Sequence, residues 1–293
     1  MTGVSRRAVL GLAGAGVVWA MVGCRDGGDD DEGSVDEEDG VDVIAYGDED
    51  LQRGALSLPE GTGPHPVVVL VHGGFWRAEW NRSLMDPLAE TVVAAGWAAW
   101  NIDYRPVGGG GGWPATFTDL AAAVDHLAEL ADEHALDLER VAVVGHSAGG
   151  TLALWSAARA GLPDDAPGAG PVVDPAAVVS QAGVVNLAAA SIEQLGQGAV
   201  DDLMGGSATV VGDRYGLASP IERIPLGVPT LLVHGRADPI VPVVLSETYR
   251  DRATEAGDDV TAHLLDDVDH FAVIEPDHEA WTGVLEWLGE RLA

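Results

Sequence analysis

The ten residues VAVVGHSAGG, at positions 141–150, decide the fold of this 293-residue chain. The β-branched run at 141–144 is typical of a strand that is buried on both faces of a parallel sheet. Gly145 and Gly149 lie two residues before and after Ser147, and this spacing predicts a sharp strand-to-helix turn that exposes the serine hydroxyl. The pattern alone occurs by chance about 0.2 times in such a chain, so the strand before it and the helix after it give it its meaning.

Strands and helices alternate on both sides of this turn. Further strands are expected at residues 53–58, 66–71, 97–102, 177–180, 230–233 and 260–265, and helices at 83–95, 116–135, 152–160, 246–256 and 278–292. This alternation predicts an α/β fold with a doubly wound, mostly parallel sheet of about eight strands and helices on both faces. Residues 186–219 have weak periodicity and are interpreted as a lid or cap.

Two loops at the carboxyl ends of strands supply partners for Ser147, because a serine hydroxyl needs a base and the base needs an orienting acid. In this fold class the order along the chain is Ser, acid, His. Asp238 is the only carboxylate in residues 234–242, HGRADPIVP. His270 is the only histidine between the last expected strand and the final helix. We therefore predict a triad of Ser147, Asp238 and His270.

Acyl transfer also needs backbone N–H groups that await the negative charge on the former carbonyl oxygen. The N–H of Ala148, which follows the nucleophile, is expected to be one of them. The others are expected from residues 72–76, HGGFW, and we favour Gly74 and Phe75. A phosphate cradle is the alternative for this glycine pair, but the longer glycine spacing and the lysine of such a loop are missing.

Four other residues near these loops need an interpretation. Trp76 and Trp113 are expected to line the substrate pocket, and packing in the core is an equal interpretation for each. His146 fills the variable position of the turn and is interpreted as structural, whereas Asp269 beside His270 is interpreted as a solvated loop residue. The mechanism requires no metal and no organic cofactor, so none is expected.

The motifs HGGFW and GHSAGG together resemble those of the α/β-hydrolase superfamily, in the esterase/lipase branch that includes hormone-sensitive-lipase-like esterases and kynurenine formamidases. The resemblance spans about residue 43 to the C-terminus, and NIDYR at 101–105 and AGVVNL at 182–187 agree with it. It implies the fold, the triad, the oxyanion loop and a two-step acyl-enzyme mechanism. It does not imply the substrate, since function depends on the site rather than on the fold.

Residues 1–23 are expected to be an export signal peptide. Arg6 and Arg7 precede an uncharged apolar run at 8–22, which is too short to span a membrane. The start of the chain resembles a twin-arginine export signal.

The single cysteine, Cys24, follows this apolar run in the sequence MVGC, which resembles a lipobox. The resemblance implies a lipidated Cys24 and a lipoprotein on the outer face of the cytoplasmic membrane. An ordinary signal peptide with a chance cysteine is the alternative. Residues 24–42 are rich in acids and lack aromatics, which predicts a disordered linker before a hydrolase domain at 43–293.

The net charge is −32, and the chain contains no lysine. Residues 43–293 alone hold 37 acids against 12 arginines, a net charge of −25. This acidity argues against a nucleic-acid partner, and one cysteine excludes both a disulfide framework and a cysteine-rich zinc site. Adaptation to high salt and a genome that avoids lysine codons remain equal explanations of the charge.

An exported hydrolase of small carboxylic esters is the leading hypothesis for the function. An arylformamidase is the alternative within the enzyme class, and a peptidase is the third. A non-catalytic, surface-binding lipoprotein on a hydrolase scaffold is the alternative of another class, although all the triad and oxyanion residues are kept. The sequence does not indicate the oligomeric state.

Overall fold

The computed structural model describes residues 36–38 and 41–293. These residues contain one nine-stranded sheet, with the strand order β1-β2-β3-β5-β4-β6-β7-β8-β9. The strands are β1 (Asp36–Glu38), β2 (Val41–Ala45), β3 (Arg53–Ser57), β4 (His65–Val71), β5 (Ala98–Ile102), β6 (Leu136–His146), β7 (Ala177–Gln181), β8 (Thr230–Gly235) and β9 (Val260–Leu265). The six strands from β5 to β9 in this order are parallel, whereas β1, β2 and β3 pair antiparallel. The predicted mostly parallel sheet is confirmed.

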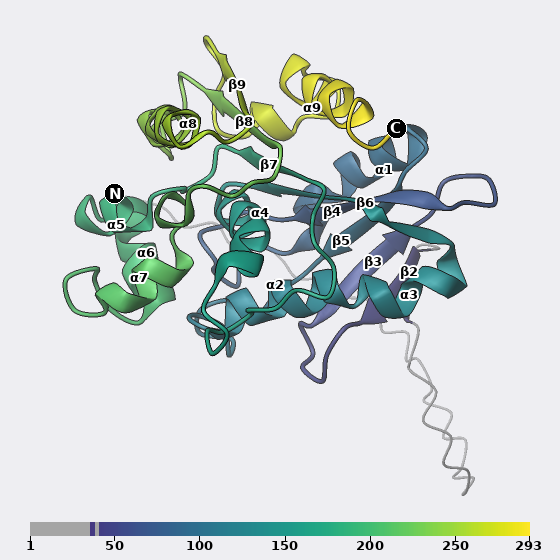
Figure 1. Cartoon of the computed structure of the whole chain (residues 1–293), viewed down its shortest axis with the longest axis horizontal. Coiled ribbons are helices and arrows are strands. Elements are labelled where there is room, and N and C mark those ends of the chain that lie inside the picture. The colour runs from purple at the N-terminus through teal and green to yellow at the C-terminus, as the bar shows by residue number, and fades with distance from the viewer. Residues whose placement is uncertain (1–35, 39–40) are drawn as a thin grey trace, which may run out of the picture. The chain divides into compact units, whose positions relative to one another are not determined.

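Helices cover both faces of this sheet (Figure 1). One face carries α1 (Asp86–Ala94) and α9 (Glu279–Gly289), and the other carries α2 (Ala115–Asp125), α3 (Leu127–His134), α4 (Ala148–Ala158) and α8 (Val244–Ala256). Three helices lie in the segment interpreted as a lid or cap: α5 (Leu187–Ile192), α6 (Leu195–Met204) and α7 (Gly212–Ala218). The 3₁₀ turns are Arg82–Met85, Arg159–Gly161, Pro220–Arg223 and Ala272–Ile274.

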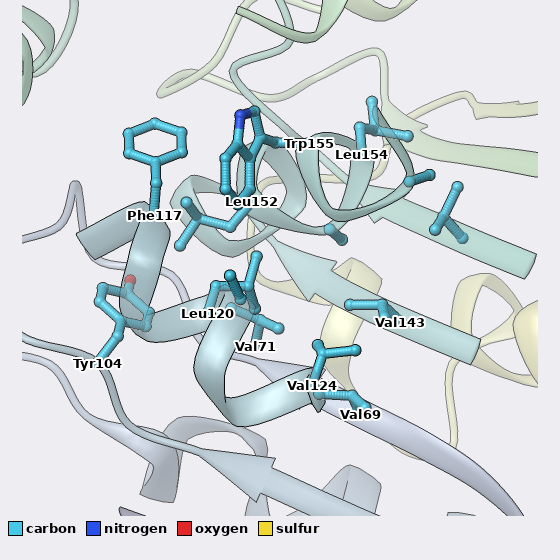
Figure 2. Packing of buried hydrophobic residues seen from close by; sticks show 14 of the residues in the cluster. Val69, Val71, Tyr104, Phe117, Leu120, Val124, Val143, Leu152, Leu154 and Trp155 are labelled. Carbon is cyan, nitrogen blue, oxygen red and sulfur yellow. The ribbon is translucent and has the colours of Figure 1, made fainter. Parts of the chain in front are cut away.

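Strand β4 shows why both faces are covered. Its side chains alternate between the faces, so Val67, Val69 and Val71 pack under α2 and α4 while Val68 and Leu70 pack under α1 and α9. All five are fully buried. Figure 2 shows the first of these two cores, in which the labelled residues are Val69, Val71, Tyr104, Phe117, Leu120, Val124, Val143, Leu152, Leu154 and Trp155. Burial on both faces explains the unbroken apolar run in the sequence.

The helix expected at 116–135 is two helices in the structure. Helices α2 and α3 meet at His126, and α3 ends at Ala135 in the left-handed conformation, with φ of 49°. No glycine or proline marks the break at His126, so the helical periodicity runs through it. Strand β6 also begins earlier than expected, at Leu136, because its first residues pair with the start of β4.

The disordered linker predicted for 24–42 is wrong at its C-terminal end. Strand β1 and the first residues of β2 lie inside this range and pair antiparallel, with Asp36 opposite Val43 and Glu38 opposite Val41. Sheet pairing uses backbone groups, so an acidic composition does not prevent it. The predicted signal peptide at 1–23 and Cys24 lie outside the described residues. Within the described ranges, no helix is both long enough and apolar enough to cross a bilayer.

Candidate active site

Ser147 lies on the predicted sharp turn, between the end of β6 and the start of α4. Its backbone has φ of 54° and ψ of −116°, a conformation that L residues rarely adopt, and its N–H donates to the Gln181 carbonyl at 2.7 Å. A Cβ atom on Gly145 would collide with the Gly149 carbonyl oxygen, and one on Gly149 would collide with that of Val71. The two glycines are therefore required by close backbone approach, and they hold the turn against β4.

Asp238 and His270 come together from the loops that follow β8 and β9. His270 Nδ1 lies 2.6 Å from Asp238 Oδ2. The other oxygen, Oδ1, accepts the backbone N–H groups of Ile240 at 2.8 Å and Val241 at 2.9 Å. Asp269 Oδ1 accepts the N–H of Phe271 and orders the turn that carries His270. The pair predicted from the sequence is thus held from both sides.

The Asp238 carboxyl is ionised at neutral pH. Burial alone would raise its pKa, but hydrogen bonds from His234, His270 and the Val241 N–H outweigh burial and hold the pKa well below its usual range. A buried carboxylate bonded to Nδ1 of His270 fixes the histidine tautomer that leaves Nε2 without a proton. Since Ser147 and His270 line the same cleft, Nε2 is the atom available to a serine hydroxyl.

The loop after β4 has an unusual backbone. Gly74, Phe75 and Trp76 have positive φ angles of 109°, 50° and 57° in succession. Gly74 and Phe75 line the cleft with Ser147. The start of the loop is fixed because the His72 ring stacks on Tyr104, with centroids 4.3 Å apart, and the Tyr104 hydroxyl donates to the His72 carbonyl.

Ala148 is the first residue of α4, and it lies fully buried directly behind Ser147. The N-terminus of a helix carries partial positive charge and free N–H groups, which favour developing negative charge. Of the three residues predicted for the oxyanion, Gly74 and Phe75 line the cleft with Ser147, and Ala148 follows Ser147 at the start of α4.

A cleft of about 360 Å³, counting space open to solvent, lies over Ser147. Its walls are mostly apolar and aromatic: Gly74, Phe75, Trp80, Leu84, His146, Ser147, Ile240, His270 and Phe271. Trp80 and Phe271 are about 40% exposed and stack with their ring centroids 6.0 Å apart. The cleft can hold a small group without charge, and its lining among the described residues includes no arginine or carboxylate to pair with a charged one.

The two tryptophans predicted for the pocket lie elsewhere. Trp76 is fully buried in the core that includes Val71 and Phe117, because the two positive φ angles at Phe75 and Trp76 turn its side chain inward. Trp113 packs edge-on against Phe117, with centroids 5.1 Å apart. Trp80 is the tryptophan that lines the cleft instead.

His146 contacts His270 through both its ring and its Nε2. It is fully buried, its ring lies 4.7 Å from the His270 ring, and its Nε2 donates to the His270 carbonyl at 2.9 Å. Because that carbonyl can only accept, Nε2 carries the hydrogen. Burial, together with the charge of His270, lowers the pKa of His146 to about 3, so the ring is neutral at neutral pH. The position is consistent with a structural role.

Among residues 36–38 and 41–293, no three His, Cys, Asp or Glu side chains gather into a group that could hold a metal ion.

Comparison with known proteins identifies the family. The family model BD-FAE matches residues 56–252, which is more than half of the chain. The chain belongs to the BD-FAE family. This match contains Ser147 and Asp238 and ends before His270, which the structure brings to the same site.

This BD-FAE protein is similar to esterase LipQ of Mycobacterium tuberculosis, with 30% identity over 66% of this chain and 46% of LipQ. It is also similar to a kynurenine formamidase of Meyerozyma guilliermondii, with 32% identity over 38% of this chain and 40% of that enzyme. The chain thus spans less than half the length of these two curated relatives.

The fold of the BD-FAE protein is that of known esterases. The structure of Thermogutta terrifontis esterase 2 phosphoramylated by tabun superposes with a TM-score of 0.69 at 21% identity, over 87% of this chain and 94% of that one. The resemblance to the α/β-hydrolase superfamily is confirmed by this fold and by the family match.

Sequence reasoning missed the apolar walls of the cleft and one histidine. Trp80 and Phe271 lie within a few residues of the oxyanion loop and of His270, so closeness in sequence was a usable signal for both. Leu84 and Ile240 carried no such signal. His234 was visible as the first residue of the loop that holds Asp238, yet its contact with that carboxylate required the structure.

Proposed function

We propose that this BD-FAE protein is a serine hydrolase that cleaves small carboxylic esters through an acyl-enzyme intermediate. The observation that carries the proposal is the buried Asp238–His270 pair, 2.6 Å apart, in which His270 lines one cleft with a serine on a strained turn. Its esterase relatives and its family support the same chemistry.

The proposed reaction has two halves. His270 Nε2 takes the proton of Ser147 as the serine oxygen attacks the ester carbonyl carbon, and the charge on the carbonyl oxygen meets the N–H groups of Gly74, Phe75 and Ala148. The C–O bond to the alcohol breaks, and His270 returns the proton to the alcohol. Water then attacks the acyl-enzyme by the same steps and releases the acid and free Ser147.

The walls of the cleft favour a small, uncharged acyl or alcohol group. Phe75, Trp80 and Phe271 offer apolar and aromatic surface beside Ser147, and such surface stabilises a ligand roughly in proportion to the apolar area it covers. A free carboxylate there would lose its hydration without gaining a cationic partner.

A panel of p-nitrophenyl esters from acetate to decanoate tests this function. We expect kcat/KM to be highest for short chains and Ser147→Ala to lose at least about 10³-fold in kcat. Turnover that is unchanged in Ser147→Ala would contradict the proposal.

An arylformamidase is the second candidate, and the match to the formamidase of Meyerozyma guilliermondii favours it. The same serine chemistry would transfer a formyl group from nitrogen. N-formylkynurenine belongs in the same panel, and a kcat/KM for it above that of every ester would make the formamidase the better description. The proposed export counts against an arylformamidase, because tryptophan breakdown is expected in the cytoplasm.

We further propose that the enzyme is exported and tethered by lipid at Cys24, at the outer face of the cytoplasmic membrane. The single cysteine at the end of the apolar run and the paired arginines support this. Labelling of cells with a radioactive or alkyne-bearing fatty acid should mark the wild-type chain but not Cys24→Ala. Equal labelling of the two would contradict the tether.

A further inference from the structure

A second histidine, besides His270, contacts the Asp238 carboxylate. His234, the fifth residue of β8, is fully buried, and its Nε2 lies 3.2 Å from Asp238 Oδ2. This is the oxygen that also binds His270. One carboxylate oxygen therefore contacts two buried imidazoles, and the mechanism above uses only one of them.

The hydrogen-bond partners of His234 determine which of its nitrogens carries the hydrogen. Nε2 faces the Val241 carbonyl at 2.9 Å as well as Asp238, and both can only accept. Nε2 therefore carries the hydrogen. Its N–H donates to the Val241 carbonyl and also contacts the Asp238 carboxylate. Nδ1 lies 2.8 Å from Ser246 Oγ of α8, whose hydroxyl donates to it in the neutral ring. Ser246 is also fully buried.

His234 also holds the turn on which Asp238 lies. The Val241 carbonyl accepts from His234, while the N–H of the same residue donates to Asp238 Oδ1. One imidazole thus contacts the carboxylate directly and fixes a residue that binds its other oxygen. Other ionisable groups around this chain of contacts are His270 on Asp238 and His146 on His270.

We propose that His234 is a positioning residue for catalysis, which holds the Asp238 carboxylate against His270 through Nε2 and is itself oriented by Ser246. The inference rests on the proposed function of Ser147, Asp238 and His270. Contacts then run from Ser246 through His234 and Asp238 to His270, which lines the cleft with Ser147. Its inner end lies in the core, where water cannot replace a lost contact.

Two amide variants separate this role from packing. The amide nitrogen of Gln extends about as far from the backbone as Nε2, so His234→Gln keeps a donor toward Asp238. The shorter His234→Asn reaches only the Nδ1 side, toward Ser246. We expect His234→Gln to stay within a few-fold of wild type, and His234→Asn to lower kcat by about 10- to 100-fold with little change in KM, as misplacement of a catalytic group does.

The pH profile of kcat/KM should shift in a direction that follows from the lost contact. Loss of the His234 N–H concentrates negative charge on Asp238 Oδ2, the oxygen that contacts the catalytic imidazole. The acidic limb of kcat/KM should therefore move to higher pH in His234→Asn and stay in place in His234→Gln. A purely structural histidine would lower the amount of folded enzyme without moving this limb.

Two further measurements make the test decisive. Ser246→Ala leaves the imidazole in place, so a folding defect of the His234 variants does not affect it. This variant should move the acidic limb in the same direction as His234→Asn, by a smaller amount. Proton NMR of the far-downfield imidazole N–H in the His270–Asp238 bond reports on the carboxylate without turnover. This resonance should shift in His234→Asn and remain near its wild-type position in His234→Gln.

The outcomes distinguish the inference from the function on which it rests. An unreactive wild type would remove the proposed function, and the NMR comparison would still test the contact. Equal kinetics, equal pH limbs and equal downfield resonances in His234→Gln, His234→Asn and Ser246→Ala would overturn the role of His234.

Discussion

Among single residues, Asp238 has the role that depends most on protonation state. An amide in its place would point an N–H at His270 Nδ1, so the ring would carry its hydrogen on Nε2 and lose the lone pair that Ser147 needs. Asp238→Asn should lower kcat on a short-chain ester by about 10³- to 10⁴-fold with little change in KM. A loss below about tenfold would mean that another group orients His270.

The buried ring of His146 predicts a pH dependence of stability. Burial, with a contribution from the His270 charge, lowers its pKa to about 3, whereas an unfolded histidine titrates near 6.5. Between these values the unfolded chain binds a proton that the folded chain does not. This histidine therefore contributes nothing above about pH 7, and it destabilises the fold by about 1.4 kcal/mol for each pH unit below about 6.5.

Urea unfolding of wild type and His146→Gln between pH 4.5 and 8 measures this effect. Below pH 6 the free energy of unfolding should fall less steeply with decreasing pH in the variant than in wild type. The difference in slope should correspond to the uptake of about one proton on unfolding. The difference between the two proteins at pH 8 supplies the control, because it contains only packing and hydrogen bonding. Parallel curves across the whole range would contradict the assignment.

Some residues of the site could be predicted from the sequence and others could not, and the difference depends on which structural feature places each side chain. The serine, the aspartate and the histidine follow strand ends, so chain order and loop position were enough to find them. Trp76 and Trp80 could not be told apart, since positive φ angles at Phe75 and Trp76 decide which side chain turns into the core.

Among elements, the helical segment that contains α5, α6 and α7 is linked to the loop after β4. Arg77 follows that loop, and its Nη2 donates to the Gly196 carbonyl at 2.7 Å. Residues 194–198 form a turn with positive φ at four of five positions, and a Cβ on Gly196 would come within 2.7 Å of the Phe75 ring. Two strained segments thus rest on each other beside the cleft.

Arg77→Met removes this link and should lower kcat/KM by about tenfold, the equivalent of one hydrogen bond to a charged group. Arg214→Met is the matched control, because Arg214 also donates to a backbone carbonyl at 2.7 Å, that of Met204, without contacting the loop. The control should lose stability alone. Equal kinetic losses in both variants would show that this helical segment acts only through general stability.

Element types were easier to predict than their boundaries. Apolar β-branched runs identified the buried strands, because burial on both faces leaves few alternatives at those positions. The break between α2 and α3 has no signal in the sequence. Strand β1 lies at the sheet edge and pairs through its backbone, so no side-chain pattern indicated it.

The charge of the whole molecule makes its stability depend on salt. With 37 acids against 12 arginines in residues 43–293, like charges repel across the surface, and raising salt from 0.1 to 1 M shortens the screening length from about 10 to 3 Å. We expect Tm to rise by about 2–8 °C over this range.

A sucrose series of matched water activity is the control. Sucrose is excluded from the protein surface and so stabilises the folded state, but it does not screen charges. A Tm that is flat in NaCl would contradict a role for charge repulsion. Activity over the same salts separates the two explanations of the acidity, since an optimum near physiological salt would argue against adaptation to a high-salt habitat.

Covalent capture tests the proposal that Ser147 is the nucleophile of an acyl-transfer site. The wild-type protein is incubated with a fluorophosphonate, and its intact mass and peptides are measured. We expect one adduct per chain on the peptide that contains Ser147, formed much more slowly in Asp238→Asn and absent in Ser147→Ala. No adduct on the folded wild type, or an undiminished adduct in Ser147→Ala, would contradict it.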